Sequence, residues 1–168
     1  MQKNIIIGLL LSLLFLGCSS SETNTENIEA KLVQNKSLTG LSLKNQFEKQ
    51  QTLNKETKTL IFAFSKDMGH TCNDFFETKG ENYLKDNKAE FIADVSGAPS
   101  LIRSMFILPG LKDFKHTVLV IDDKNIAAAY KKGLDAEKII IVSLNDGTIT
   151  SIKSIQTAQE LQASIEVK

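Results

Sequence analysis

The segment LIFAFSKDMGHTC, residues 60–72, decides the fold. Its first five residues form a continuous apolar run, which is typical of a strand buried on both faces of a sheet. The polar stretch that follows contains Gly69 and ends at Cys72, and the residues after it have helical spacing. A buried strand, a turn and a helix in this order predict an α/β domain with a central, largely parallel sheet.

Strands and helices alternate through the rest of the chain. Further apolar runs predict strands at residues 91–95, 117–121 and 139–144. Helices are predicted between them, at residues 72–85, 100–108 and 125–132. The second of these helices lies between Pro99 and Pro109-Gly110, and the third ends at Gly133.

The end of the chain predicts a hairpin followed by a helix. Asn-Asp-Gly at residues 145–147 is a strong hairpin signal, and it joins the strand at 139–144 to an antiparallel partner at 148–155. Residues 157–160 have the pattern of a capping box. The closing helix then has one apolar stripe, formed by Ala158, Leu161 and Ile165.

The N-terminus has the form of an export signal. Lys3 is followed by the apolar residues 5–16, a stretch too short for an ordinary membrane-spanning helix. Phe15-Leu16-Gly17-Cys18 resembles the lipobox of bacterial lipoproteins, which implies cleavage of a signal peptide at residues 1–17 and lipid, including palmitate, on Cys18. Ser19 resembles the residue type of lipoproteins sorted to the outer membrane, so we expect a cell envelope lipoprotein that faces the periplasm. An uncleaved anchor helix or a plain secretory signal are the alternatives.

Composition separates a linker from a folded domain. Residues 18–36 are rich in Ser, Thr, Asn and Glu after the lipidated cysteine, which predicts a flexible linker. Residues 37–168 then form one domain with a single core. Twenty basic and twenty acidic residues give no net field that would attract nucleic acid. After lipidation of Cys18 only Cys72 is left as a thiol, so we expect no internal disulfide.

The order of these elements resembles the thioredoxin-like superfamily, in particular its peroxiredoxin-like branch. Residues 43–53 look like the family's N-terminal hairpin, and residues 118–122, 127–134 and 139–147 are similar to its succession of strand, short helix, strand and hairpin. The later half also resembles periplasmic YtfJ-type proteins, in which the redox motif is absent. The resemblance implies a thioredoxin-like α/β fold with a central mixed sheet, flanking helices, a β-hairpin and a C-terminal helix.

The resemblance gives Cys72 two alternative roles. In a thioredoxin-type register Gly69 and Cys72 take the places of the C-x-x-C motif, with the attacking cysteine replaced. In a peroxiredoxin register Cys72 is the peroxide-reactive cysteine, but the family's Thr is Gly69 here. Thr71 is a plausible N-cap, which places Cys72 in the first helical turn, where backbone amides favour a thiolate. His70 is then a candidate proton handler.

Other readings of the same residues stay open. A free cysteine commonly behaves as a small buried apolar residue. The chain also lacks a second thiol in this domain and a proline near residues 136–138, which disfavours dithiol exchange. Met68, His70 and Cys72 are suitable ligands for Cu(I) if the turn is extended, but we expect no metal site and no cofactor.

We therefore expect one of two function classes. The first is a single-cysteine thiol redox protein, a thiol-dependent oxidoreductase or peroxidase that acts through Cys72 on a thiol or peroxide substrate. The second is a non-catalytic binding or interaction module with the same fold. Copper handling is a third alternative. In each case the membrane is a partner through the lipid on Cys18.

Overall fold

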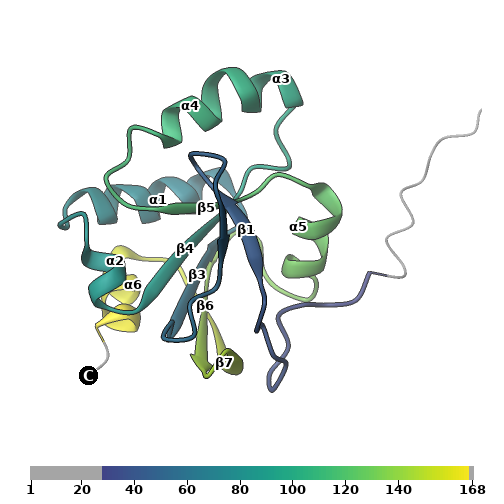
Figure 1. Cartoon of the computed structure of the whole chain (residues 1–168), viewed down its shortest axis with the longest axis vertical. Helices are drawn as coiled ribbons and strands as arrows, with labels where there is room; N and C mark the ends of the chain where they lie inside the picture. Colours follow the sequence, from purple (N-terminus) through teal and green to yellow (C-terminus); the bar gives the residue numbers. More distant parts are fainter. Residues whose placement is uncertain (1–27, 167–168) are drawn as a thin grey trace, which may run out of the picture.

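The computed structural model describes residues 28–166, so the expected signal peptide, Cys18 and residues 19–27 of the expected linker lie outside the described residues. The described chain forms one seven-stranded mixed sheet with the strand order β2-β1-β5-β4-β3-β6-β7 (Figure 1). The strands are β1 (Ser42–Asn45), β2 (Gln50–Thr52), β3 (Thr59–Ala63), β4 (Ala89–Asp94), β5 (Val118–Ile121), β6 (Ile139–Asn145) and β7 (Thr148–Ile155).

Strand β3 lies in the interior of the sheet, as its continuous apolar sequence predicts. All five of its residues are buried. It pairs in parallel with β4 on one side and antiparallel with β6 on the other. Strand β4 in turn pairs in parallel with β5, so the centre of the sheet is parallel and its flanks are antiparallel. The predicted mixed sheet is confirmed.

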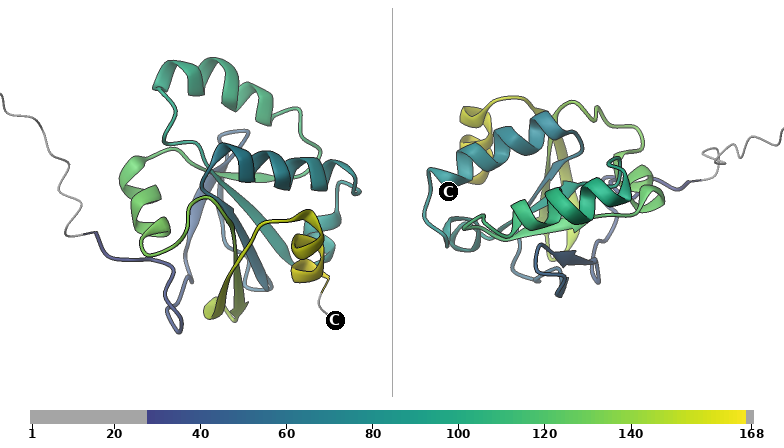
Figure 2. Two further views of the ribbon diagram at one scale, coloured as in Figure 1. Left: turned by 180° about the vertical axis from the view of Figure 1, so that it is seen from behind. Right: turned by 90° about the horizontal axis from the view of Figure 1, so that it is seen from above.

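Each face of the sheet carries its own hydrophobic core, because successive side chains of a strand point to opposite faces. One core packs under α1 (Lys66–Glu77), α2 (Tyr83–Asp86) and α6 (Ala158–Ile165). The other packs under α5 (Lys124–Lys131) and the N-terminal residues of the described chain (Figure 2). No helix within residues 28–166 combines the length and the apolar character needed to cross a bilayer.

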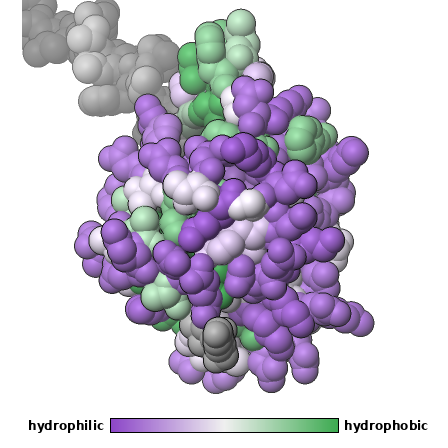
Figure 3. All heavy atoms as spheres, turned by 90° about the vertical axis from the view of Figure 1, so that its left-hand side faces the viewer, coloured by the Kyte–Doolittle hydropathy of each residue, from purple (hydrophilic) through white to green (hydrophobic). Residues whose placement is uncertain are grey.

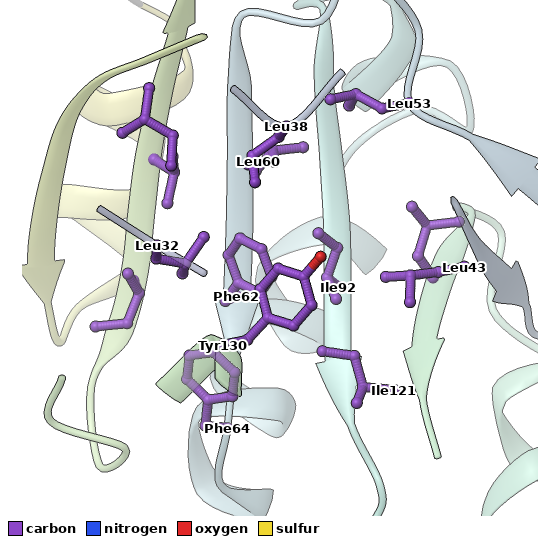
Figure 4. Close-up of a cluster of buried hydrophobic side chains, with 14 of the residues drawn as sticks. Leu32, Leu38, Leu43, Leu53, Leu60, Phe62, Phe64, Ile92, Ile121 and Tyr130 are labelled. Carbon is purple, nitrogen blue, oxygen red and sulfur yellow. The ribbon is translucent and has the colours of Figure 1, made fainter. Parts of the chain in front are cut away.

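The second core is built around aromatic side chains from β3 and α5. Phe62 has no exposed surface, and its ring lies 5.6 Å from that of Tyr130 and 5.6 Å from that of Phe64 (Figure 4). Leu60 and Ile92, from β3 and β4, are also fully buried in this cluster. Aromatic rings at this spacing contribute both buried area and favourable ring–ring contacts, so this core locks α5 onto the sheet.

The predicted hairpin and closing helix are both confirmed. Asp146 and Gly147 have φ values of 48° and 75°, as a two-residue turn that follows the twist of its strands requires. Thr157 and Glu160 form a complete capping box at the start of α6. The apolar stripe of α6 then buries Leu161 and Ile165 against the first core.

The first helix begins earlier than the sequence analysis predicts. α1 runs from Lys66, not from Cys72, and Ser65 is its N-cap residue. Two N-cap residue types, Ser65 and Thr71, lie close together in the sequence, and the fold uses the first. The helix ends at Glu77, before Gly80, and α2 follows as a separate short helix.

A continuous helical segment at residues 100–111 connects β4 to β5. It consists of α3 (Ser100–Ile102), the π-helical turn η2 (Arg103–Ile107) and α4 (Leu108–Leu111), and we call it the 100–111 helix. We predicted from the sequence that this helix ends before Pro109, but it continues through Pro109 to Leu111. A proline ring collides with the carbonyl four residues earlier in a regular α-helix. The wider π turn, in which Leu108 N–H donates to Arg103 C=O, accommodates it.

The described part of the expected linker packs on the domain. Lys31 N–H donates to Ala129 C=O at 2.9 Å and Asn35 N–H to Ile149 C=O at 2.8 Å. Leu32 is buried in the second core. These contacts hold residues 31–35 against the sheet and α5, so this part of the expected linker packs on the folded domain.

Candidate binding site

Cys72 lies in the hydrophobic core, not at the start of a helix. It is the seventh residue of α1, and its side chain is fully buried in the first core together with Phe75 and Phe76. The prediction that Cys72 occupies the first helical turn is therefore wrong. The amides that favour an anion belong to the first turn of a helix, and this turn carries Lys66 and Asp67 instead of a thiol.

Burial controls the chemistry of this thiol. It raises the pKa of Cys72 to about 12, because the apolar surroundings disfavour the charged form. The thiolate is the nucleophilic form of cysteine, so at neutral pH Cys72 is a protonated, apolar side chain. Within residues 28–166 Cys72 is also the single cysteine, so no second thiol is near it.

Thr71 and His70 do not assist Cys72. The Thr71 hydroxyl donates to the Asp67 carbonyl at 3.0 Å, within the helix, so its predicted role as N-cap is wrong. Each helical residue turns by about 100°, and His70 is exposed while Cys72 is buried two residues later. For the same reason Met68, His70 and Cys72 do not converge, since the extended turn that a copper site needs is a helix here.

A different site lies beside the predicted one, and we call it the α1–α4 pocket. It has a volume of about 540 Å³ and lies at the carboxyl ends of β3 and β4, between α1 and the 100–111 helix. Ligands of open α/β sheets commonly bind at the carboxyl ends of the parallel strands. Its apolar lining comes from Phe64, Phe91, Val95, Ile107, Leu111 and Phe114.

Small residues create the space for this pocket. Ala63 at the end of β3 and Ala93 in β4 are partners in the parallel register, and both line the pocket. Gly69 on α1 also lines it, and a Cβ atom placed there meets no atom within 4 Å. Because Ala63, Ala93 and Gly69 are small, α1 and the two strands leave the volume of the pocket open.

One stripe of α1 faces the pocket and carries three of its polar side chains. Lys66, Gly69, His70 and Asn73 line the pocket at a spacing of three to four residues, which places them along one side of the helix. The side that carries Cys72 faces the core instead. Of the predicted site residues, His70 thus belongs to the pocket and Cys72 does not.

Two polar atoms at the pocket are buried without a partner. Ser65 Oγ and Asn73 Oδ1 have no hydrogen bond within the described chain, and both residues line the pocket. Ser65 does not use its hydroxyl to cap α1 either. Most buried polar atoms in proteins are hydrogen-bonded, so each unpaired one calls for an explanation such as a bound molecule.

An ion pair borders the pocket at the end of β4. The Lys131 ammonium lies 3.3 Å from Asp94 Oδ2, and the Asp94 side chain is 3% exposed. Asp94 Oδ1 accepts a hydrogen bond from Ser96 N–H at 2.8 Å, which fixes the carboxylate. The pair balances its own charge, so it does not select for a charged ligand.

Comparison with solved structures identifies the architecture. StoA from Bacillus subtilis superimposes with a TM-score of 0.51 at 10% identity, over 74% of this chain and 95% of StoA. The thioredoxin domain of a thiol-disulfide oxidoreductase from Bacteroides vulgatus superimposes with a TM-score of 0.50 at 11% identity, over 80% of this chain and 99% of that domain. The chain has a thioredoxin-like fold. This confirms the predicted thioredoxin-like fold.

Two further comparisons complete the result. The peroxidoxin BcpB from Mycobacterium tuberculosis gives a TM-score of 0.49 at 11% identity, over 79% of this chain and 93% of that protein. No protein family model and no curated protein matches the sequence. At these identities the likeness concerns the fold, and membership of the superfamily and of its peroxiredoxin-like branch stays a prediction.

The pocket and its two unpaired polar atoms were not predicted from the sequence. A partial signal was present, because Met68, Cys72, Phe75 and Phe76 follow a helical spacing that extends α1 back toward Ser65. The pocket itself depends on how far the 100–111 helix lies from α1, which no local pattern encodes.

Proposed function

We propose that this protein is a non-catalytic binding module with a thioredoxin-like fold, which takes a mainly apolar ligand with one neutral polar group into the α1–α4 pocket. We further propose that it is a lipoprotein of the bacterial cell envelope, anchored through Cys18 and facing the periplasm, at the outer membrane. The lipobox resemblance at residues 15–18 supports this location.

The chemistry of the pocket supports this ligand class. Pockets of 300–1,000 Å³ with apolar walls and a few fixed polar groups are typical of small-molecule sites. The observation that carries the proposal is that Ser65 Oγ and Asn73 Oδ1 are buried at the pocket without a partner. A hydroxyl, amine or amide group on the ligand reaches either atom only after the Ser65 or Asn73 side chain rotates toward the cavity. Lys131 adds no free charge to the pocket, because it is already paired with Asp94.

Single-thiol redox chemistry at Cys72 has less support. The sulfur is fully buried and its pKa is raised to about 12, so it is neither accessible nor ionised in this conformation. Peroxide or a partner thiol reaches it only after α1 opens from the sheet. The fold is compatible with thiol chemistry in relatives, but function depends on the site and not on the fold.

Binding of a neutral apolar dye tests the proposal. N-phenyl-1-naphthylamine has two aromatic groups, a naphthyl and a phenyl, joined by one N–H donor, and its fluorescence rises in apolar surroundings. It is titrated into the chain that lacks residues 1–27, because the described residues contain the complete sheet and both cores. We expect saturable binding with one site per chain.

Two glycine substitutions separate the pocket from the fold. Gly69→Leu places a side chain into the pocket from a position where a Cβ atom meets nothing within 4 Å. It also replaces a glycine inside a helix by leucine, and this replacement stabilises the helix by about 1 kcal/mol. Gly80→Leu is the matched control, since Gly80 also has open space around it but lies outside the pocket.

The outcomes of this experiment are distinct. We expect Gly69→Leu to abolish dye binding without loss of stability, and Gly80→Leu to bind as the wild type does. Equal dye binding by all three proteins contradicts the assignment of the pocket as the ligand site.

A further inference from the structure

The 100–111 helix carries an exposed apolar surface on the side away from the pocket. Leu101, Ile102, Met105 and Phe106 are 64%, 44%, 58% and 65% exposed, and we call them the outer patch. Their spacing places them on one side of a helix. In Figure 3 hydrophobic side chains gather at the end of the molecule where this helix lies, above a largely hydrophilic surface.

The fold cannot bury the outer patch by a simple rotation of this helix. Its inner side already contacts the pocket through Ile107, Gly110 and Leu111. Both sides of the helix are thus apolar, and the domain covers only one of them. An exposed cluster of large apolar side chains marks a surface that contacts another apolar phase or a partner.

The charges around the patch favour an anionic surface. Residues 95–112 contain Arg103 and Lys112 but no acidic residue, and Asp94 and Asp113 flank this stretch. Arg103 is half-buried within the patch, and within the described residues neither it nor Lys112 belongs to an ion pair. An arginine stem packs against apolar groups while its guanidinium binds a phosphate. Basic residues beside large apolar side chains are typical of helices that lie in a membrane interface.

The length of chain before the domain limits its distance from an anchor. Nine residues, 19–27, separate Cys18 from the first described residue, Ile28. Nine residues span at most about 30 Å when fully extended. Ile28 C=O accepts a hydrogen bond from Lys132, next to α5. In Figure 1 this start of the described chain lies on the right-hand side of the molecule, below α5, and α3 lies on the same side at the top.

We propose that the outer patch docks into the surface of the lipid bilayer to which the chain is anchored. The apolar side chains enter the boundary between headgroups and acyl chains, about 5–10 Å deep, and Arg103 contacts lipid phosphates. This inference rests on the proposed lipid anchor at Cys18, and it is independent of the proposed ligand in the α1–α4 pocket.

Tryptophan fluorescence of the full-length, lipid-modified protein tests the docking. The chain contains no tryptophan, so Phe106→Trp introduces a single reporter in the patch. Phe47→Trp is the matched control, because Phe47 is 51% exposed but lies in the turn between β1 and β2. Each variant is reconstituted into vesicles of phosphatidylethanolamine and phosphatidylglycerol, with and without brominated acyl chains.

Flotation of the vesicles separates anchoring from docking. We expect both variants to float with the vesicles, and we expect a blue-shifted emission that brominated lipid quenches for Phe106→Trp only. Flotation with water-like, unquenched emission at residue 106 overturns the docking and leaves the anchor intact. Failure to float overturns both the anchor and the docking. A blue shift that arises only when an envelope protein extract is added assigns the patch to a protein partner and also overturns the proposal.

Discussion

The reactivity of Cys72 gives the sharpest test of whether this protein uses thiol chemistry. The experiment uses a chain with Cys18→Ser, so that Cys72 is the sole thiol. A thiol reagent is added at pH 8, first to the folded protein and then to the protein unfolded in urea. Both reactions are followed by the absorbance of the released thiolate.

The structure sets the size of the expected effect. At pH 8 a thiol with a pKa of about 12 is ionised in about 1 molecule in 10⁴. An unperturbed thiol, with a pKa of about 8.5, is ionised in about a quarter of molecules. The difference in ionisation alone therefore makes labelling of Cys72 about 10³-fold slower in the folded protein than in the unfolded chain. Complete burial of Cys72 adds to this protection.

Peroxide provides the second half of this test. We expect no sulfenic acid on folded Cys72 after exposure to peroxide, because formation of a sulfenic acid requires an accessible thiolate. Labelling of the folded protein as fast as the unfolded chain, or a trapped sulfenic acid, would refute the core assignment. Either result would favour a single-cysteine redox protein instead.

Two further predictions concern stability. Burial lowers the pKa of His116, and the carboxylate of Glu77 opposes this only in part. The unfolded chain therefore binds a proton at this histidine more readily than the folded chain does. We expect the urea midpoint to fall as the pH drops below about 6.5, and we expect a smaller fall in His116→Phe. Gly147 has φ 75° and a Cβ atom there lies 2.8 Å from Thr39 Oγ1, so Gly147→Ala should lower the free energy of unfolding by about 1–2 kcal/mol. Gly133 has φ 80° and open space around it, so Gly133→Ala measures the cost of the backbone conformation alone. Equal losses of unfolding free energy in the two variants would show that the Thr39 contact is negligible.

The fold was largely predictable because its signals are local. The apolar run at residues 60–64 predicts a buried strand whatever surrounds it. The Asn-Asp-Gly turn and the Thr157–Glu160 capping box also act through neighbouring backbone groups. These elements appear in the structure where the sequence places them.

The start of α1 was not predictable from capping preference alone. Ser65 and Thr71 are both favourable N-cap residues. What decides between them is the end of β3 at Ala63 and the packing of Cys72 on the sheet, and both are tertiary features. Because α1 starts at Lys66 and not at Cys72, the thiol lies in the core and not at the amide-rich start of the helix. The chemistry predicted for the thiol changes with its position.

The candidate site was even less accessible to sequence reasoning. The α1–α4 pocket forms between two segments about thirty residues apart, and its volume depends on Ala63 and Ala93 becoming partners in the sheet. Alanine and glycine at such positions look like ordinary core and helix residues until the neighbouring strands are known. Only the assembled fold shows that they leave space.

The central claim is that the α1–α4 pocket, and not Cys72, is the working site. Native mass spectrometry of the full-length protein isolated from bacterial membranes tests it directly, with Gly69→Leu and Gly80→Leu prepared in parallel. We predict one non-covalently bound ligand mass per chain in the wild type and in Gly80→Leu, and none in Gly69→Leu. A ligand mass that persists in Gly69→Leu, or a covalent adduct on Cys72, would contradict the account.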